Sequence, residues 1–321
     1  MINAIAITGP TASGKTALSL SLAEILGGEI ISMDSMQIYR GMDVGTAKAT
    51  PEEQRRAPHH MLDVVSPKES FSSRDYREMA LPIAKAIADS GKTPIFVGGT
   101  GLYLASLKRA GLEEVPPADA NYRDKILATL AAEEDRIALW ERLREIDPVS
   151  AEATHYNNVR RVIRAIEIYE KTGVTKSELD RLSRQGASDI NILHLTLDFH
   201  SRDTLYSRID KRVDLMLEAG LYDEVTALYE SGELLPDTTA AQAIGYKEII
   251  DCIKDGRPLS EAVQTIKQGS RNYAKRQLTW FRHEEGAFVI YADGDGGEMR
   301  RAEEILDDAI QIINEHFTRI S

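Results

Sequence analysis

The segment GPTASGKT, residues 9–16, constrains the fold of this chain more than any other feature, because it matches the phosphate-binding pattern G-x-x-x-x-G-K-[S/T]. A strand-like apolar run, INAIAI (2–7), precedes it and a helical stretch (15–26) follows, which is the context that the pattern requires. The glycines permit a tight loop whose backbone N–H groups converge on phosphate oxygens. The sequence therefore predicts a site for a nucleotide or another phosphorylated ligand at Gly9, Pro10, Thr11, Ala12, Ser13, Gly14, Lys15 and Thr16, with the Thr16 hydroxyl as the expected Mg²⁺ ligand.

Short apolar runs bounded by Gly, Asp or Pro predict buried parallel strands at residues 2–7, 29–34, 93–99, 192–199 and 288–293. Helical stretches at 15–26 and 73–91, with apolar residues at three-and-four spacing, separate the first three strands. This alternation predicts an α/β fold with a doubly wound parallel sheet, whose ligands bind at the carboxyl ends of the strands. A last helix is expected to pack on the core through Ile305, Ala309, Ile312 and Ile313.

An all-helical segment interrupts this pattern. The stretch LEEVPPADANYR, which begins at residue 112, is typical of a linker, and residues 122 to about 183 are helical with no strand candidate. Gly173 is the expected carboxyl cap of one of these helices. Because a sheet strand follows, we expect an inserted helical subdomain at 113–189, and a catalytic core with carboxyl-terminal helices formed by 1–112 and 190–321.

Charge and composition exclude several classes of protein. The formal charge of −12 argues against a protein that coats nucleic acid through its overall field. Two acid-free segments, 154–164 and 264–283, nevertheless concentrate arginine and aromatic residues; each is either a local nucleic-acid surface or simply a solvated helix face. No apolar run approaches the roughly 20 residues of a membrane helix, and no leader segment is visible, so we expect a cytoplasmic protein without membrane contact.

The usual companions of a hydrolytic phosphate loop are missing. The best candidate strand for a metal-binding aspartate, TPIFVGG, ends in Gly98 and Gly99, and no N-K-x-D guanine-binding motif occurs. The loop is thus expected to bind phosphate without hydrolysing a nucleotide.

Asp34 and Thr100 follow two strands whose carboxyl ends should lie beside the phosphate loop. Asp34 is therefore expected to face the reacting phosphate and to accept a proton, although it could also cap the next turn. The Gly-Gly-Thr-Gly turn at 98–101 would let backbone approach a ligand and present the Thr100 hydroxyl, although its glycines could merely shape the turn.

Several longer motifs resemble the tRNA dimethylallyltransferases, also called tRNA isopentenyltransferases or the IPP transferase family. They occur in the family's order and approximate spacing, over nearly the whole chain, and DSMQIYRGMDVGTAK is very specific to this family. These motifs are GPTASGKT (9–16), MDSMQIYRGMDVGTAK (33–48), HHMLD (59–63), VGGTGLYL (97–104), NNVRRVIRAIEIYE (157–170), AIGYKEI (243–249) and RQLTWFR (276–282).

The resemblance implies transfer of a dimethylallyl group from dimethylallyl diphosphate to N6 of the adenosine at tRNA position 37, beside the anticodon. It also implies a P-loop kinase-like core with an inserted helical domain that binds the anticodon stem-loop. The chain lacks the Cys and His residues of members with a carboxyl-terminal zinc finger, so it resembles the shorter bacterial form.

Carried over by motif, the resemblance assigns catalysis to Asp34, as general base, and to Thr100. The loop at residues 11–16 would be the diphosphate cradle, Arg208 an additional diphosphate ligand, and Mg²⁺ would be bound at Thr16. The implied tRNA contacts are Asp34, Ser35, Met36, Gln37, Thr100, Arg123, Asn158, Val159, Arg160, Arg161, Val162, Arg276, Gln277 and Trp280.

Two other functions stay open on the sequence. A P-loop kinase of a nucleoside or small metabolite would explain the loop and Asp34, but neither the arginine-rich segments nor the 34–48 motif. A non-catalytic RNA-binding ATPase switch is a third reading, against which the missing metal aspartate counts. Nothing in the sequence demands more than a monomer.

Overall fold

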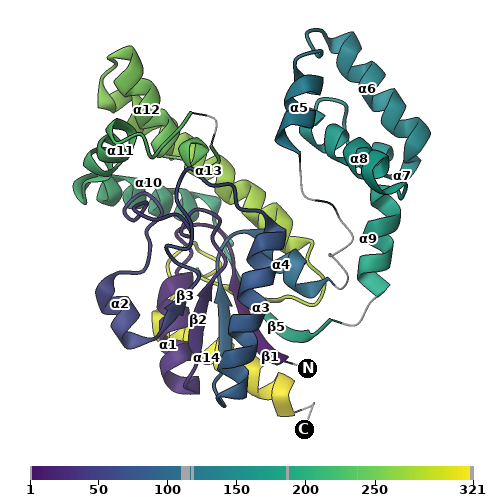
Figure 1. The fold of residues 1–321 in the computed structure, drawn as a ribbon. Helices are drawn as coiled ribbons and strands as arrows, with labels where there is room; N and C mark the ends of the chain where they lie inside the picture. Colours follow the sequence, from purple (N-terminus) through teal and green to yellow (C-terminus); the bar gives the residue numbers. More distant parts are fainter. Residues whose placement is uncertain (1, 110–115, 117–118, 186–187, 237, 319–321) are drawn as a thin grey trace. The chain divides into compact units, whose positions relative to one another are not determined.

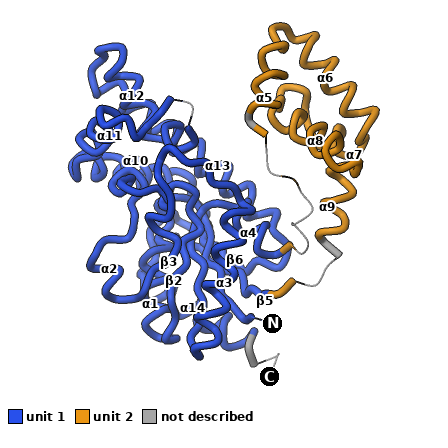
Figure 2. Tube along the Cα trace, in the orientation of Figure 1, with its two compact units in different colours: residues 1–108, 190–321 blue, residues 109–189 orange. Residues whose placement is uncertain are grey.

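The computed structural model describes residues 2–109, 116, 119–185, 188–236 and 238–318. Its contacts divide the chain into two compact units, residues 1–108 with 190–321, and residues 109–189 (Figure 2). The second unit and the predicted insertion end at the same residue, Asp189, whereas the insertion's predicted start at 113 and most of the linker lie outside the described residues. Each unit is described separately below.

A six-stranded, all-parallel sheet forms the centre of the first unit (Figure 1), which confirms the predicted fold class. The five predicted strands are all present. The strand that the sequence did not predict, β3, has only two residues and shows no periodicity. In chain order the strands are β1 (Ile2–Thr8), β2 (Glu29–Ser32), β3 (His59–His60), β4 (Pro94–Val97), β5 (Ile190–Asp198) and β6 (Phe288–Tyr291), and their spatial order is β3-β2-β4-β1-β5-β6.

Helices cover both faces of this sheet. Along β1, Ile5 and Ile7 pack against α1 (Lys15–Leu26) and α14 (Ala302–Thr318). The alternate residues Ala4 and Ala6 pack on the opposite face, in a cluster with α3 (Ser73–Asp89) and α4 (Gly101–Lys108). Alternate side chains of a strand point to opposite faces, so burial on both sides explains the nearly continuous apolar runs in the sequence. The expected apolar stripe of α14 packs on this core.

A helical layer packs on the segment that follows β2. Tyr39 and Met42 lie in one buried cluster with Val213, Tyr246 and Ile249. The layer thereby fixes the loop that leaves the carboxyl end of β2. A short helix, α2 (Pro51–Arg56), follows that loop, and the layer itself contains α10 (Arg202–Glu218), α11 (Leu221–Glu230), a 3₁₀ turn (Ala240–Gln242), α12 (Tyr246–Asp255) and α13 (Leu259–Arg282).

Helices are the only regular secondary structure among the described residues of the second unit. Its core contains Leu143, Val162 and Ile166, and the carboxylate of Asp147 joins two helix starts by accepting from the backbone N–H groups of Ser150 and Ser177. Gly173 ends a helix with φ 71°, as predicted. The helices are α5 (Ala120–Leu127), α6 (Glu133–Ile146), α7 (Pro148–Glu152), α8 (Val159–Thr172) and α9 (Lys176–Gln185). Throughout the described parts of the chain, no helix is both long and apolar enough to cross a membrane.

Candidate active site

The phosphate loop lies between β1 and α1, as the motif predicts. Gly9, at φ 135°, has no room for a side chain, because a Cβ there would lie 2.5 Å from the Leu197 carbonyl oxygen. Lys15 Nζ donates to the carbonyl oxygens of Gly9 (3.0 Å) and Pro10 (2.6 Å). The Ser13 hydroxyl is buried and has no hydrogen-bond partner among the described residues. An unpaired buried hydroxyl beside a converging set of N–H groups suits a phosphate ligand.

Two helices hold this loop from outside. Arg208, in α10, donates from Nε to the Ala12 carbonyl oxygen at 2.8 Å. Gln277, in α13, accepts from the Thr11 backbone N–H at 2.9 Å. Arg208, predicted as a diphosphate ligand, therefore lies in the cavity wall with part of its guanidinium already engaged by the loop.

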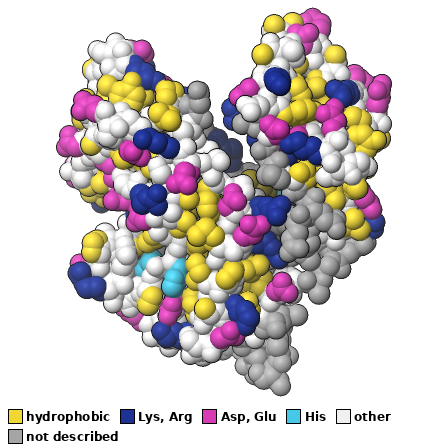
Figure 3. Space-filling model, in the orientation of Figure 1, with side chains coloured by type: hydrophobic (Ala, Val, Ile, Leu, Met, Phe, Trp, Pro, Cys, Tyr) yellow, Lys and Arg dark blue, Asp and Glu magenta, His cyan; other side chains and the backbone are white. Residues whose placement is uncertain are grey.

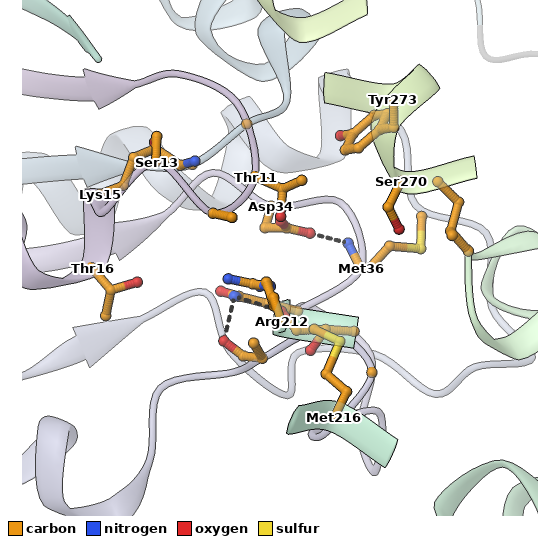
Figure 4. A pocket seen from close by; sticks show the side chains of 18 of the residues that line it. Thr11, Ser13, Lys15, Thr16, Asp34, Met36, Arg212, Met216, Ser270 and Tyr273 are labelled. Atoms are coloured by element: carbon orange, nitrogen blue, oxygen red, sulfur yellow. Dashed lines mark hydrogen bonds between the residues drawn. The ribbon is translucent and has the colours of Figure 1, made fainter. Parts of the chain in front are cut away.

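Asp34 lies just beyond β2, beside the loop (Figure 4). Its Oδ1 accepts from the Met36 backbone N–H at 2.8 Å, so the turn-capping role considered for this residue is present. Within the described residues, its second carboxylate oxygen receives no hydrogen bond from the protein. The Thr100 hydroxyl accepts from the Ser35 backbone N–H at 3.1 Å. The structure thus brings the two predicted catalytic residues together at neighbouring strand ends.

A cavity of about 840 Å³ is lined by the phosphate loop and by Asp34, whereas Thr100 is not part of its wall. The phosphate loop, Asp34 and Arg212 line one part of it, and Tyr273 and Ser270 of α13 line another (Figure 4). Apolar side chains complete the wall, among them Met36, Met216, Ile244 and Ile266. The cavity therefore presents a basic end, a carboxylate and an apolar surface to one ligand space.

Arg212 is a site residue that the sequence reasoning missed. It lies one helical turn after Arg208 on α10 and lines the same cavity. Burial and the Arg212 guanidinium lower the pKa of Lys15 to about 7, against the opposing effect of Asp34. Burial also lowers the pKa of Arg212, again opposed by Asp34. The i, i+4 spacing of the two arginines was the signal that could have identified it.

Gln37, predicted as a tRNA contact, is engaged inside the protein. It accepts from the Ser32 hydroxyl at 2.8 Å and donates to the carbonyl oxygens of Thr46 (3.2 Å) and Ala47 (3.3 Å). Glu224 of α11 holds the same loop by accepting from three successive backbone N–H groups, those of Asp43, Val44 and Gly45, and from the Tyr246 hydroxyl.

The basic segment on α13 carries less unpaired positive charge than its sequence indicates. Lys267, Arg271 and Arg282 pair with acids from other elements. Arg276 is exposed above the Tyr273 ring, and Trp280 is 37% exposed and lies against Gly101. On the face drawn in Figure 3, basic and acidic side chains of the first unit are interspersed. The acid partners are Asp214 and Asp210 of α10 and Asp198 of β5.

The other predicted tRNA contacts belong to the second unit. Asn158, Arg160 and Arg161 are exposed around the start of α8, where Val159 is partly buried. Neither arginine forms an ion pair within the described part of the chain. Val162, in contrast, is fully buried in this unit's core, so its side chain packs the helix and offers no surface to a ligand. The Arg123 guanidinium lies 3.7 Å from the buried carboxylate of Glu167.

No preformed metal cage accompanies the loop: among the described residues, no three His, Cys, Asp or Glu side chains cluster in a way that could hold an ion. Thr16 is exposed at the cavity wall and offers one hydroxyl oxygen. One oxygen ligand fits Mg²⁺ only as an ion that arrives with phosphate oxygens and keeps several waters.

Comparison with known proteins gives concordant matches. The family model "IPP transferase" matches residues 37–284, and "Isopentenyl transferase" matches residues 2–69. A tRNA dimethylallyltransferase of Bacillus velezensis is 48% identical over 280 residues, which cover 87% of each chain. The crystal structure of a tRNA isopentenylpyrophosphate transferase from Bacillus halodurans superposes with a TM-score of 0.71 at 41% identity, covering 98% of this chain and 96% of that one. A eukaryotic dimethylallyltransferase acting on tRNA gives a TM-score of 0.81 at 30% identity, covering 99% and 80%.

Proposed function

Because the chain belongs to the IPP transferase family, we propose that it transfers a dimethylallyl group from dimethylallyl diphosphate to N6 of the adenosine at position 37 of tRNA. The observation that carries this proposal is the shared cavity, in which Asp34 lies beside the anion-binding loop and Arg212. The products are N6-dimethylallyladenosine in tRNA and free diphosphate. A tRNA substrate is consistent with the cytoplasmic location expected from the sequence; the monomeric state remains a prediction.

The phosphate loop would hold the leaving group. As the C1–O bond of the donor breaks, the bonding electrons pass to diphosphate and its negative charge grows. Backbone N–H groups of residues 13–16, the amino end of α1, Lys15 and Arg212 would stabilise that charge. The unpaired hydroxyl of Ser13 would gain the acceptor that it lacks among the described residues.

Asp34 would activate the nucleophile. The N6 lone pair of adenosine is delocalised into the purine ring, so N6 attacks C1 effectively only if its proton leaves as the C–N bond forms. The carboxylate oxygen of Asp34 that does not bond to Met36 would accept this proton. A positioned base of this kind contributes about 10²–10⁴-fold to the rate.

Mg²⁺ would be held by the Thr16 hydroxyl together with diphosphate oxygens, and when bound it would neutralise part of the leaving group's charge. The chain's own residues do the rest: the loop and α10 bind the diphosphate, and the apolar wall around Met36 and Met216 excludes water from the reacting carbon.

The RNA has to present an unstacked base to this cavity, which costs a few kcal/mol and costs less in a loop than in a duplex. Met36, Thr100 and Trp280 on the first unit, and the exposed arginines of α8 on the second, are the proposed contacts with the anticodon stem-loop.

A kinase is the other candidate, because a loop of this type usually binds ATP. It leaves the sequence motif at 34–48 without a purpose, and the described residues after β4 offer two glycines where a metal-binding aspartate would stand. The family, and the names of the relatives that this chain resembles, favour prenyl transfer.

Digestion of tRNA after incubation tests the proposal. Unmodified tRNA, dimethylallyl diphosphate, Mg²⁺ and the protein should yield one adenosine per anticodon loop that is heavier by a single isoprenoid unit. An unmodified nucleoside pool after prolonged incubation, with tRNA shown to bind, would exclude this activity.

A further inference from the structure

Gln277 lies on α13 between two positions that the family resemblance assigns to RNA, but its side chain points inward. Arg276 is exposed and Trp280 is 37% exposed, whereas Gln277 is only 5% exposed. Its Oε1 accepts from the Thr11 backbone N–H at 2.9 Å, and its Nε2 donates to the Gly99 carbonyl oxygen at 3.0 Å. We propose that Gln277 is a positioning residue that fixes the phosphate loop against the turn carrying Thr100, and not an RNA contact.

The phosphate loop needs such a support. Ala12 adopts φ 62°, the left-handed region that is unfavourable for a residue with a Cβ by roughly 1–2 kcal/mol. An unfavourable backbone conformation persists only where the surrounding structure holds it. Gln277 binds the backbone N–H of Thr11, the residue before Ala12. Arg208 binds the carbonyl oxygen of Ala12 itself. The loop conformation is thus held from α13 and α10 before any ligand binds.

The amide nitrogen of Gln277 binds the turn at residues 98–101, which carries Thr100. A Cβ at Gly99 would lie 2.0 Å from Gln277 Nε2, so the glycine is what admits the amide. The same turn is tied to β2, because the Thr100 backbone N–H donates to the Met33 carbonyl oxygen at 3.2 Å. One buried amide therefore links the loop that would hold diphosphate with the turn that packs beside Asp34.

A positioning role for Gln277 predicts different effects on the binding of the two substrates, RNA and diphosphate. Loss of the amide leaves the exposed face of α13 intact, so RNA binding should persist. It frees the Thr11 N–H and lets the loop relax from its left-handed conformation, so binding of a diphosphate should weaken. The transfer readout below rests on the proposed function, whereas the pyrophosphate readout does not.

The test compares Gln277→Leu with Gln264→Leu, a control on the exposed side of the same helix. Inorganic pyrophosphate with Mg²⁺ is titrated by calorimetry, tRNA binding is measured separately, and the transfer rate is followed with saturating tRNA. Loss of one hydrogen bond with its buried partner left unpaired should weaken pyrophosphate binding and raise the KM for the donor by about tenfold or more. The tRNA affinity of Gln277→Leu and all constants of Gln264→Leu should stay near those of the wild type.

Unchanged pyrophosphate affinity in Gln277→Leu, or a loss confined to tRNA, would overturn the proposal. The wild-type protein supplies a second test that needs no variant: without ligand, the Thr11 amide should exchange its hydrogen more slowly than the amides of Gly14 and Lys15. Rapid exchange at Thr11 would contradict the bond. The wild type could fail to transfer a prenyl group while pyrophosphate binding is weakened in Gln277→Leu and the Thr11 amide exchanges slowly. In that case the proposed function fails and the positioning role stands.

Discussion

The Thr100 hydroxyl accepts a 3.1 Å hydrogen bond from the backbone N–H of Ser35, the residue that follows Asp34. This bond joins the ends of β2 and β4, and the Asp34 Oδ1 bond to Met36 N–H then orients the carboxylate. One carboxylate oxygen is therefore committed to the turn, and the other is the oxygen proposed to accept the N6 proton.

Asp34→Asn separates these two roles, because an amide oxygen can still accept from Met36 but cannot take up a proton at neutral pH. We expect the single-turnover rate of transfer to fall by more than about 100-fold, within the usual range for loss of a general base. Asp34→Ala should fall at least as far, and tRNA affinity should persist in both. A near-normal rate in Asp34→Asn would remove this residue as the base.

Arg212→Gln tests the residue that the sequence did not reveal. Loss of a charged hydrogen bond to diphosphate should weaken pyrophosphate binding by about 10- to 100-fold. Arg202→Gln, at an exposed position at the start of α10 that does not line the cavity, is the matched control and should bind pyrophosphate almost normally. Equal losses in the two variants would mean that general charge, and not a specific contact, is responsible.

Lys15 gives the site a pH dependence. Burial, with the nearby Arg212, lowers its pKa to about 7 in the free protein, and a bound anion should raise it again. The lysine is therefore charged below this pKa and must take up a proton on binding above it. Pyrophosphate affinity should fall by up to about tenfold per pH unit above pH 7. Calorimetry in buffers of different ionisation enthalpy should detect the proton uptake at pH 8, and none would contradict the lowered pKa.

The second unit is tested by Arg160→Ala and Arg161→Ala. If each guanidinium contacts a phosphate, tRNA binding should weaken and the slope of log K against log salt should fall by about one unit for each lost contact. Pyrophosphate affinity should not change. Arg142→Ala, whose guanidinium is paired with Glu170, is the control in the same unit. Unaltered tRNA affinity in both test variants would exclude this helix end as an RNA surface.

Glu224 should stabilise the loop at residues 43–45. Glu224→Ala removes the acceptor of three backbone N–H groups and of the Tyr246 hydroxyl, so the free energy of unfolding should fall by about 1–3 kcal/mol. Urea denaturation measures this change, with the exposed neighbour Asp223→Asn as control. A loss below that of the control would show that the loop holds its shape without Glu224.

Most of the features that were predicted correctly from the sequence depend on local patterns of residues. The place of the 9–16 loop between β1 and α1, the five strands and the place of Asp34 after β2 follow from residues close in the chain, and the fold confirms them. Arg212, the partners of Gln277 and the pairing of Lys267 and Arg271 with acids of α10 depend on how distant helices pack. Gln277 shares a helical stripe with the buried residues Ala274, Leu278 and Phe281, so the helical period indicates its inward direction but not its partners, Thr11 and Gly99. The two-residue β3 had no pattern to detect.

The central claim is that the dimethylallyl group is transferred to tRNA and that diphosphate is the leaving group. Its most direct test is a dimethylallyl diphosphate carrying one radioisotope in the prenyl carbons and another in phosphorus, incubated with the protein, Mg²⁺ and unmodified tRNA. The account predicts that the carbon label enters tRNA, that an equimolar amount of the phosphorus label appears as free diphosphate, and that no phosphorus label enters tRNA. Phosphorus label in the tRNA, or release of diphosphate with no carbon label in RNA, would contradict it.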